Sequence, residues 1–184
     1  MQNITQTITK YSAAAMVAIF SLSLQSCSES PDQFFGVAVL NTNTINDFAT
    51  PTLAKHINDE TVEFADIPSS KKKGDEAITM VNNKIAYLEK SLNDIKALNA
   101  NSDDRKAIKE KSVALYEYVI PVYKNEYTNY AKLCDSKADQ AKKDEIISAI
   151  EQKYATKFEQ MYIDLMDDGK AFAKQNNLNV NWGN

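Results

Sequence analysis

The clearest pattern in the chain is a row of apolar residues that recurs every three or four positions between residues 75 and 98. The row consists of Ile78, Val81, Ile85, Leu88, Leu92, Ile95 and Leu98. A spacing of about 3.5 residues keeps such side chains on one side of a helix, as in helices that pack lengthwise on one another. Asp75 is suited to cap the start, and Asn99 follows the last apolar position. We therefore predict a helix over residues 75–98.

The next segment carries two adjacent apolar rows and predicts a second long helix, from Ser102 to about Cys134. One row is Ile108, Leu115, Val119 and Val122; the other is Tyr116, Ile120, Tyr123, Tyr127, Tyr130 and Cys134. Two rows make a broad apolar face, which suits a helix with neighbours on two sides. Pro121 lies inside this run and removes one backbone hydrogen bond, so we expect a kink after about Val119.

A third long helix is predicted to follow Asp135 or Ser136, either of which is suited to cap its first turn. Its apolar positions are again spaced for one helix face: Ile147, Ile150, Tyr154, Phe158, Met161, Leu165 and Phe172. Gly169 is expected to fray or bend this helix near its end. Asn176 and Asn177 are expected to stop it.

The pattern before residue 75 is weaker. Residues 34–40 are apolar and fit either the start of a helix or a buried extended stretch. Residues 52–66 have loosely helical spacing, and Pro51 suits a first helical turn with Thr50 as its cap. Residues 68–74 have the composition of a loop. This part therefore predicts a broken helix.

Together these elements predict an all-α fold, an up-and-down helical bundle of three long antiparallel helices plus a broken N-terminal helix. The chain of 184 residues is about the length of one domain, and its four Gly and four Pro are few for an all-β fold. We assign the bundle to residues 34–177. Residues 178–184 are expected to form a C-terminal tail.

A short apolar run, residues 13–24, follows a polar start that carries Lys10. As a helix this run would rise about 18 Å, less than the roughly 30 Å of a hydrocarbon core, so it is too short to span a membrane. A charged start, a short apolar run and a small residue at the cut are typical of a secretory signal. We predict that residues 1–26 are a signal peptide, cleaved before Cys27.

The sequence Leu24-Gln25-Ser26-Cys27 resembles the lipobox of bacterial lipoproteins, in which an aliphatic residue and two variable or small residues precede a cysteine. The resemblance implies that Cys27 is the lipidation site, that fatty acyl chains such as palmitate anchor it to a membrane, and that residues 27–33 form a lipidated tether. Two or more acyl chains give stable anchoring. An ordinary signal peptide followed by a chance cysteine is the alternative.

The resemblance also bears on location and on the rest of the chain. Ser28 follows the cysteine in place of the Asp that resembles an inner-membrane retention signal, which favours the outer membrane of the cell envelope. Glu29 and Asp32 are similar to a weak export tag, so surface exposure stays open. The mature part resembles the uncharacterised helical surface lipoproteins of Gram-negative bacteria, and this resemblance implies no site residues.

Charge and cysteine content exclude some functions. The net charge is −4, and removal of the leader with its single Lys makes it 20 − 25 = −5. The only Arg is Arg105, whereas phosphate-reading surfaces favour Arg, so we expect no nucleic-acid partner. With Cys27 lipidated, Cys134 has no partner within the chain. We expect it to be a buried, inert thiol, with pairing between chains as the alternative.

Residues suited to catalysis are sparse. His56 is the only histidine and no Glu has a His three residues later, so we predict neither a metal site nor a cofactor. The acidic pairs Asp103-Asp104, Asp144-Glu145 and Asp167-Asp168 could act on a glycan if a cleft held two carboxylates about 5 to 9.5 Å apart. Pairs in opening helical turns instead complement the helix dipole.

Tyrosines are the one unusual feature. Five of nine lie between residues 116 and 130, around Pro121. A kinked helix can open a groove, and Tyr combines an apolar ring with a polar hydroxyl suited to a ligand or partner. The candidate groove residues are Tyr116, Tyr123, Tyr127 and Tyr130; the alternative is ordinary packing at the margin of the bundle.

The sequence therefore predicts a membrane-anchored envelope lipoprotein. We expect a non-enzymatic module that binds a protein, peptide or apolar ligand. The alternative is an envelope hydrolase that uses a carboxylate pair in a groove.

Overall fold

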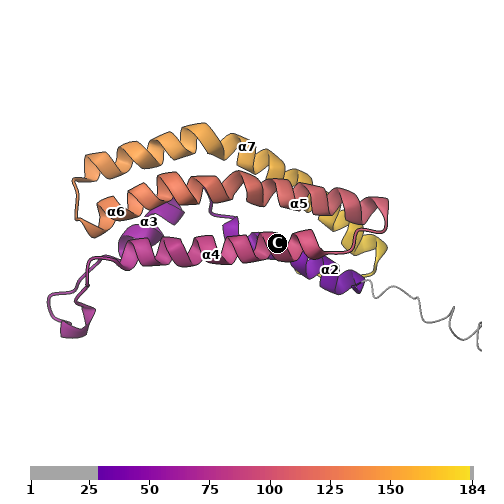
Figure 1. Ribbon diagram of the computed structural model, residues 1–184, viewed down its shortest axis with the longest axis horizontal. Helices are drawn as coiled ribbons and strands as arrows, with labels where there is room; N and C mark the ends of the chain where they lie inside the picture. Colours follow the sequence, from indigo (N-terminus) through magenta and orange to yellow (C-terminus); the bar gives the residue numbers. More distant parts are fainter. Residues whose placement is uncertain (1–28, 183–184) are drawn as a thin grey trace, which may run out of the picture.

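The computed structural model describes residues 29–182, and over that range the chain is built from helices and their connections (Figure 1). The all-α prediction is therefore confirmed. The signal peptide predicted for residues 1–26 and the lipidation predicted at Cys27 lie outside the described residues. Within residues 29–182, no helix combines the length and the apolar content needed to cross a bilayer.

Three long helical rods form the body of the molecule. The first is α4 (Glu76–Ala97), and the third is α7 (Gln140–Gln175). The middle rod lies between them and consists of α5 (Asp103–Val122), a π turn (Tyr123–Tyr127) and α6 (Thr128–Asp135) (Figure 1). Short connections make neighbouring rods antiparallel, as the spacing of apolar residues predicted.

The N-terminal part is a broken helix, as predicted, and it packs against the three rods. It contains α2 (Pro31–Ala38), a 3₁₀ turn (Leu40–Ile45) and α3 (Pro51–Asp59). The hydroxyl of Thr50 accepts a hydrogen bond from the N–H of Leu53, so the predicted cap of α3 is confirmed. The first helix begins at Pro31, three residues before the boundary we expected for the bundle.

The helical prediction for residues 52–66 is wrong in its second part, because α3 ends at Asp59. The Ser70 hydroxyl accepts a hydrogen bond from the N–H of Phe64 and lies within hydrogen-bond distance of the Phe64 and Ile67 carbonyls. Such local side-chain bonds compete with the helical backbone ladder. They hold a loop between α3 and α4 instead of a further helical turn.

Two predicted helix caps are wrong. Asp75 occupies the position before α4 but makes no capping bond with its side chain. The Asp135 carboxylate, at the end of α6, instead accepts hydrogen bonds from the N–H groups of Ala77 and Ile78 at 3.0 and 2.9 Å. Asp135 therefore caps α4 across the bundle, and α7 begins at Gln140. A distant carboxylate can fill a capping role that only tertiary packing reveals.

The irregularity near Pro121 lies further along than predicted. The helix continues past Val119 to Val122 and then widens into the π turn. A widened turn leaves carbonyls without their usual partners. The Asn125 side-chain amide donates to the Pro121 carbonyl, and the Thr128 hydroxyl donates to the Tyr123 carbonyl.

Gly169 does not fray α7, which continues to Gln175. The glycine is buried against α2 and the residue after that helix, because a Cβ atom at position 169 would lie 2.8 Å from Cγ1 of Val39. Leu178 and Val180 in the predicted C-terminal tail also pack against the core, and Trp182 meets the Phe35 ring edge-on. Close approach of α7 to the N-terminal part thus requires the missing side chain.

We predict that Gly169→Ala lowers the free energy of unfolding by about 1–2 kcal/mol, because overpacking against the stiff Val39 side chain outweighs the gain in helix propensity. Gly36→Ala is the matched control, since nothing lies within 4 Å of a Cβ atom there, and it should leave stability unchanged or raise it. Urea denaturation measures both. A Gly169→Ala protein as stable as Gly36→Ala would contradict the packing described here.

Candidate functional site

The four tyrosines predicted to line an exposed groove are all buried, with 0–3% of their surface accessible. Tyr116, Tyr123, Tyr127 and Tyr130 face the N-terminal part of the chain. The prediction of an open, tyrosine-lined groove is therefore wrong. The face exists, but the protein covers it with its own residues.

Three of the four hydroxyls bind the backbone of residues 41–54, which we call the N-terminal segment. Tyr116 donates to the Asn41 carbonyl at 3.1 Å, and Tyr130 donates to the Ala54 carbonyl at 3.1 Å. The Tyr127 oxygen accepts the N–H of Ala49 at 3.0 Å. Burial raises the pKa of Tyr127 and Tyr130, so both hydroxyls stay protonated at neutral pH.

Phe48 fills the space between these bonds. Its ring centroid lies 4.9 Å from that of Phe158, 5.9 Å from Tyr123 and 6.0 Å from Tyr127. Aromatic rings at such distances contribute beyond the area they bury. Phe48 thus occupies the position that a ligand side chain would take in the predicted groove.

Tyr123 differs from its three neighbours. It is 1% exposed, and its hydroxyl has no hydrogen-bond partner among the described residues. Burial raises its pKa well above the usual range, with a further contribution from the charge of Asp47. A buried hydroxyl without a partner costs free energy, and a bound molecule can remove that cost.

This side chain lines a cavity of about 240 Å³, which we call the inner cavity, between α3, α4 and the π turn. The remaining lining residues are Asp47, Leu53, His56, Ile57, Met80, Val81 and Lys84. Four of them are apolar, and three carry groups that can bear charge. An apolar lining with a few polar groups is the usual composition of a small-molecule site.

The charged groups of the inner cavity act on one another. The Asp47 carboxylate lies 3.8 Å from Nδ1 of His56, whose side chain is 55% exposed. The Lys84 ammonium donates to the Thr44 carbonyl. Burial lowers the pKa of Lys84, and the negative charge of Asp47 acts in the opposite direction. The cavity thus holds one acidic and one basic group that face the same space.

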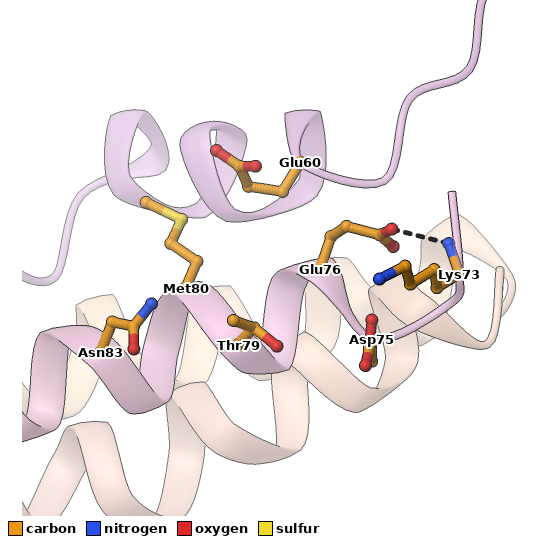
Figure 2. Close-up of a pocket in the computed structure, with 7 residues that line it drawn as sticks. All are labelled: Glu60, Lys73, Asp75, Glu76, Thr79, Met80 and Asn83. Carbon is orange, nitrogen blue, oxygen red and sulfur yellow. Dashed lines mark hydrogen bonds between the residues drawn. The ribbon is translucent and has the colours of Figure 1, made fainter. Parts of the chain in front are cut away.

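A larger, more open outer cavity of about 550 Å³ lies between the end of α3 and the start of α4 (Figure 2). Its lining includes the carboxylates of Glu60, Asp75 and Glu76, and Met80 lines both cavities. Glu76 accepts hydrogen bonds from the N–H groups of Lys73 and Gly74 at 2.6 and 3.1 Å. The bond from Lys73 is the main cause of its lowered pKa. Because Met80 lines both, the acidic outer cavity lies beside the inner cavity.

Two of the carboxylates considered for hydrolysis lie at one cavity, and both have partners. Asp104 and Asp168 line a cavity of about 170 Å³ between α5 and α7. Asp104 accepts hydrogen bonds from the Ser102 hydroxyl and the Arg105 N–H, and the Ser102 bond is the main cause of its lowered pKa. Asp168 pairs with Lys111 at 2.6 Å. A glycosidase acid needs a raised pKa, so the lowered pKa of Asp104 gives the hydrolase alternative no support.

The remaining candidate residues have simple surroundings. Cys134 is 1% exposed, and burial raises the pKa of its thiol, as expected for an inert cysteine. Over residues 29–182, no cluster of three or more His, Cys, Asp or Glu side chains is arranged to hold a metal ion.

Sequence reasoning missed Asp47 and Lys84 as site residues. Asp47 follows a stretch rich in Asn and Thr that shows no periodicity. Lys84 did carry a signal, because it lies four residues from both Met80 and Leu88, beside the apolar row. A lysine at that position must either extend to solvent or lie half-buried near an acidic partner.

No family model matches the chain, and neither the curated proteins nor the solved structures give a significant match.

We predict that Tyr127→Phe lowers the free energy of unfolding by about 1–3 kcal/mol, because it leaves the buried N–H of Ala49 without a partner. Tyr123→Phe is the matched control in the same π turn. It removes a hydroxyl that has no partner among the described residues, so stability should stay the same or rise. Urea denaturation at neutral pH compares the two, and equal losses would show that the Tyr127 bond does not hold the N-terminal segment.

Proposed function

We propose that the chain is a lipid-anchored envelope protein whose helical bundle binds a small molecule without converting it chemically. The observation that carries the binding part is the inner cavity, which is lined by Tyr123, a residue whose buried hydroxyl has no hydrogen-bond partner within the part of the chain that the structure describes. Folding leaves this polar group buried and without a hydrogen bond, and a ligand atom would supply the bond. Binding of a protein or peptide, which the sequence also allowed, stays a prediction.

The anchoring part is supported by the lipobox-like residues before Cys27, and the contacts of Glu29, two residues after it, bear on the length of the tether. The carboxylate of Glu29 accepts hydrogen bonds from the N–H of Asn99 at 3.2 and 3.3 Å. The Arg105 guanidinium donates to the Glu29 carbonyl at 3.0 Å. Because the bundle binds Glu29, the tether between the bundle and the proposed acylated cysteine would be much shorter than the predicted residues 27–33.

The short tether bears on where a ligand would enter. The first helix, α2, begins at the end of the bundle where α4 connects to α5 and α7 ends (Figure 1). The end of α3 and the start of α4, which line the outer cavity, lie at the opposite end (Figure 1). An anchor at Cys27 would keep the outer cavity, which we take as the ligand entrance, away from the lipid and open to dissolved molecules. We favour the outer membrane as the location of the anchored protein.

Replacement of Cys27 tests the anchor. We expect Cys27→Ala to move the protein from the membrane fraction to the soluble fraction of the envelope, because no acyl chain can attach. Cys134→Ala is the matched control and should stay with the membrane, since that thiol is buried in the bundle. Mass spectrometry of the mature N-terminus provides the second measurement. Unchanged fractionation of Cys27→Ala, or an unmodified Cys27 in the mature protein, would overturn the anchoring proposal.

Nuclear magnetic resonance tests the binding site. In the full chain labelled at methionine methyl groups and held in detergent, we expect some members of a panel of small amphipathic molecules to shift the Met80 signal. Met80 lines both cavities, whereas Met161 lies on α7 and serves as the internal control. A Met80→Leu variant assigns the signal. If no molecule in a panel that spans anions, cations, zwitterions and neutral compounds shifts it, small-molecule binding at this site is refuted.

A further inference from the structure

The polar groups of the inner cavity have unused bonding capacity. The Tyr123 hydroxyl makes no hydrogen bond among the described residues, and Lys84 has three ammonium protons, of which the Thr44 carbonyl takes one. The Asp47 carboxylate has the His56 imidazole as a neighbour, with Nδ1 at 3.8 Å. A negative, a positive and a neutral donor group are thus available to one bound molecule.

We propose that the inner cavity binds a small zwitterion with an apolar side chain, of the chemical class of an aliphatic amino acid. The ligand ammonium binds the Asp47 carboxylate. The ligand carboxylate accepts hydrogen bonds from the Lys84 ammonium and the Tyr123 hydroxyl. The apolar side chain packs on Leu53, Ile57 and Val81, which are all buried. This inference rests on the proposed function and specifies its ligand.

Charge explains why a zwitterion fits better than a simple ion. A ligand with only a carboxylate gains the contact with Lys84 but brings a second negative charge close to Asp47. A ligand with only an ammonium gains the contact with Asp47 and meets Lys84. Both penalties grow where burial lowers the effective dielectric, and the lowered pKa of Lys84 reflects such burial. A zwitterion satisfies both groups and adds no net charge.

Size agrees with a ligand of this class. The inner cavity measures about 240 Å³, which is below the roughly 300–1,000 Å³ of sites for drug-sized molecules. A single aliphatic amino acid suits such a space, whereas a long acyl chain or a folded peptide does not. The outer cavity is lined by three carboxylates and by Lys73, so acidic groups predominate and would repel free anions more than a neutral zwitterion.

Isothermal titration of the full chain in detergent tests the ligand class with three probes of nearly the same shape. L-leucine carries both charges, isocaproate lacks the ammonium, and isoamylamine lacks the carboxylate. We expect L-leucine to bind about tenfold or more tightly than either analogue, since each loses a charge-assisted hydrogen bond and retains one repulsion. Isocaproate or isoamylamine binding as tightly as L-leucine would overturn the zwitterion assignment while leaving small-molecule binding intact.

Variants locate the binding to the inner cavity. We expect Tyr123→Phe to weaken L-leucine binding about tenfold through loss of one hydrogen bond to a charged group. Tyr118→Phe is the matched control, because that hydroxyl donates to the Tyr154 carbonyl outside the cavity, and its affinity should be unchanged. Equal affinity of the Tyr123→Phe and unaltered proteins for L-leucine would overturn the assignment.

The Met80 signal separates the two levels of failure. In one case, other molecules of the panel shift the Met80 signal, whereas L-leucine does not shift this signal and does not bind in the titration. The ligand class is then wrong, and the proposed site stands. If nothing shifts the signal and L-leucine does not bind, both the ligand class and the proposed function fail.

Discussion

The bundle depends on hydrogen bonds between tyrosine hydroxyls and the backbone of the N-terminal segment. Residues 41–54 contain Asn and Thr, which form helices poorly, and much of the segment lies outside regular α-helix. Buried backbone groups still need partners, or each costs about 1–3 kcal/mol. Tyr116, Tyr127 and Tyr130 supply three of them, and Phe48 fills the space between. The segment, which becomes regular α-helix only from Pro51, thus becomes part of the core.

At the inner cavity, one tyrosine hydroxyl lacks the bond to the N-terminal segment that the other three make. Tyr123 lies on the same helical rod as the other three tyrosines, yet its hydroxyl reaches no backbone group of the N-terminal segment. Asp47, from that segment, and Lys84, from α4, approach the same space. A core assembled from an irregular segment and long helices leaves such gaps, because the segment cannot follow the helix surface at every residue. A gap lined by polar groups can serve as a binding site.

The same packing separates two ends of the molecule. At one end, Arg105 lies over the ring of Phe34 at 4.9 Å and donates to the Glu29 carbonyl, which holds the start of the described chain. At the other end, Asp135 caps α4 beside the loop that leads from α3. The proposed anchor and the proposed ligand entrance therefore lie at opposite ends of the bundle (Figure 1).

The sequence by itself determined the three long helices and their antiparallel order, because periodic apolar residues and short connections leave few alternatives. It also placed the cap at Thr50 and the buried thiol at Cys134. Only the tertiary structure decided which surface covers the tyrosines, why Gly169 must lack a side chain, and that Asp135 caps a distant helix. Periodicity identifies a face that needs a partner, whereas the identity of that partner depends on contacts between residues far apart in the chain. Asp47, Lys84 and Tyr123 meet only through such contacts.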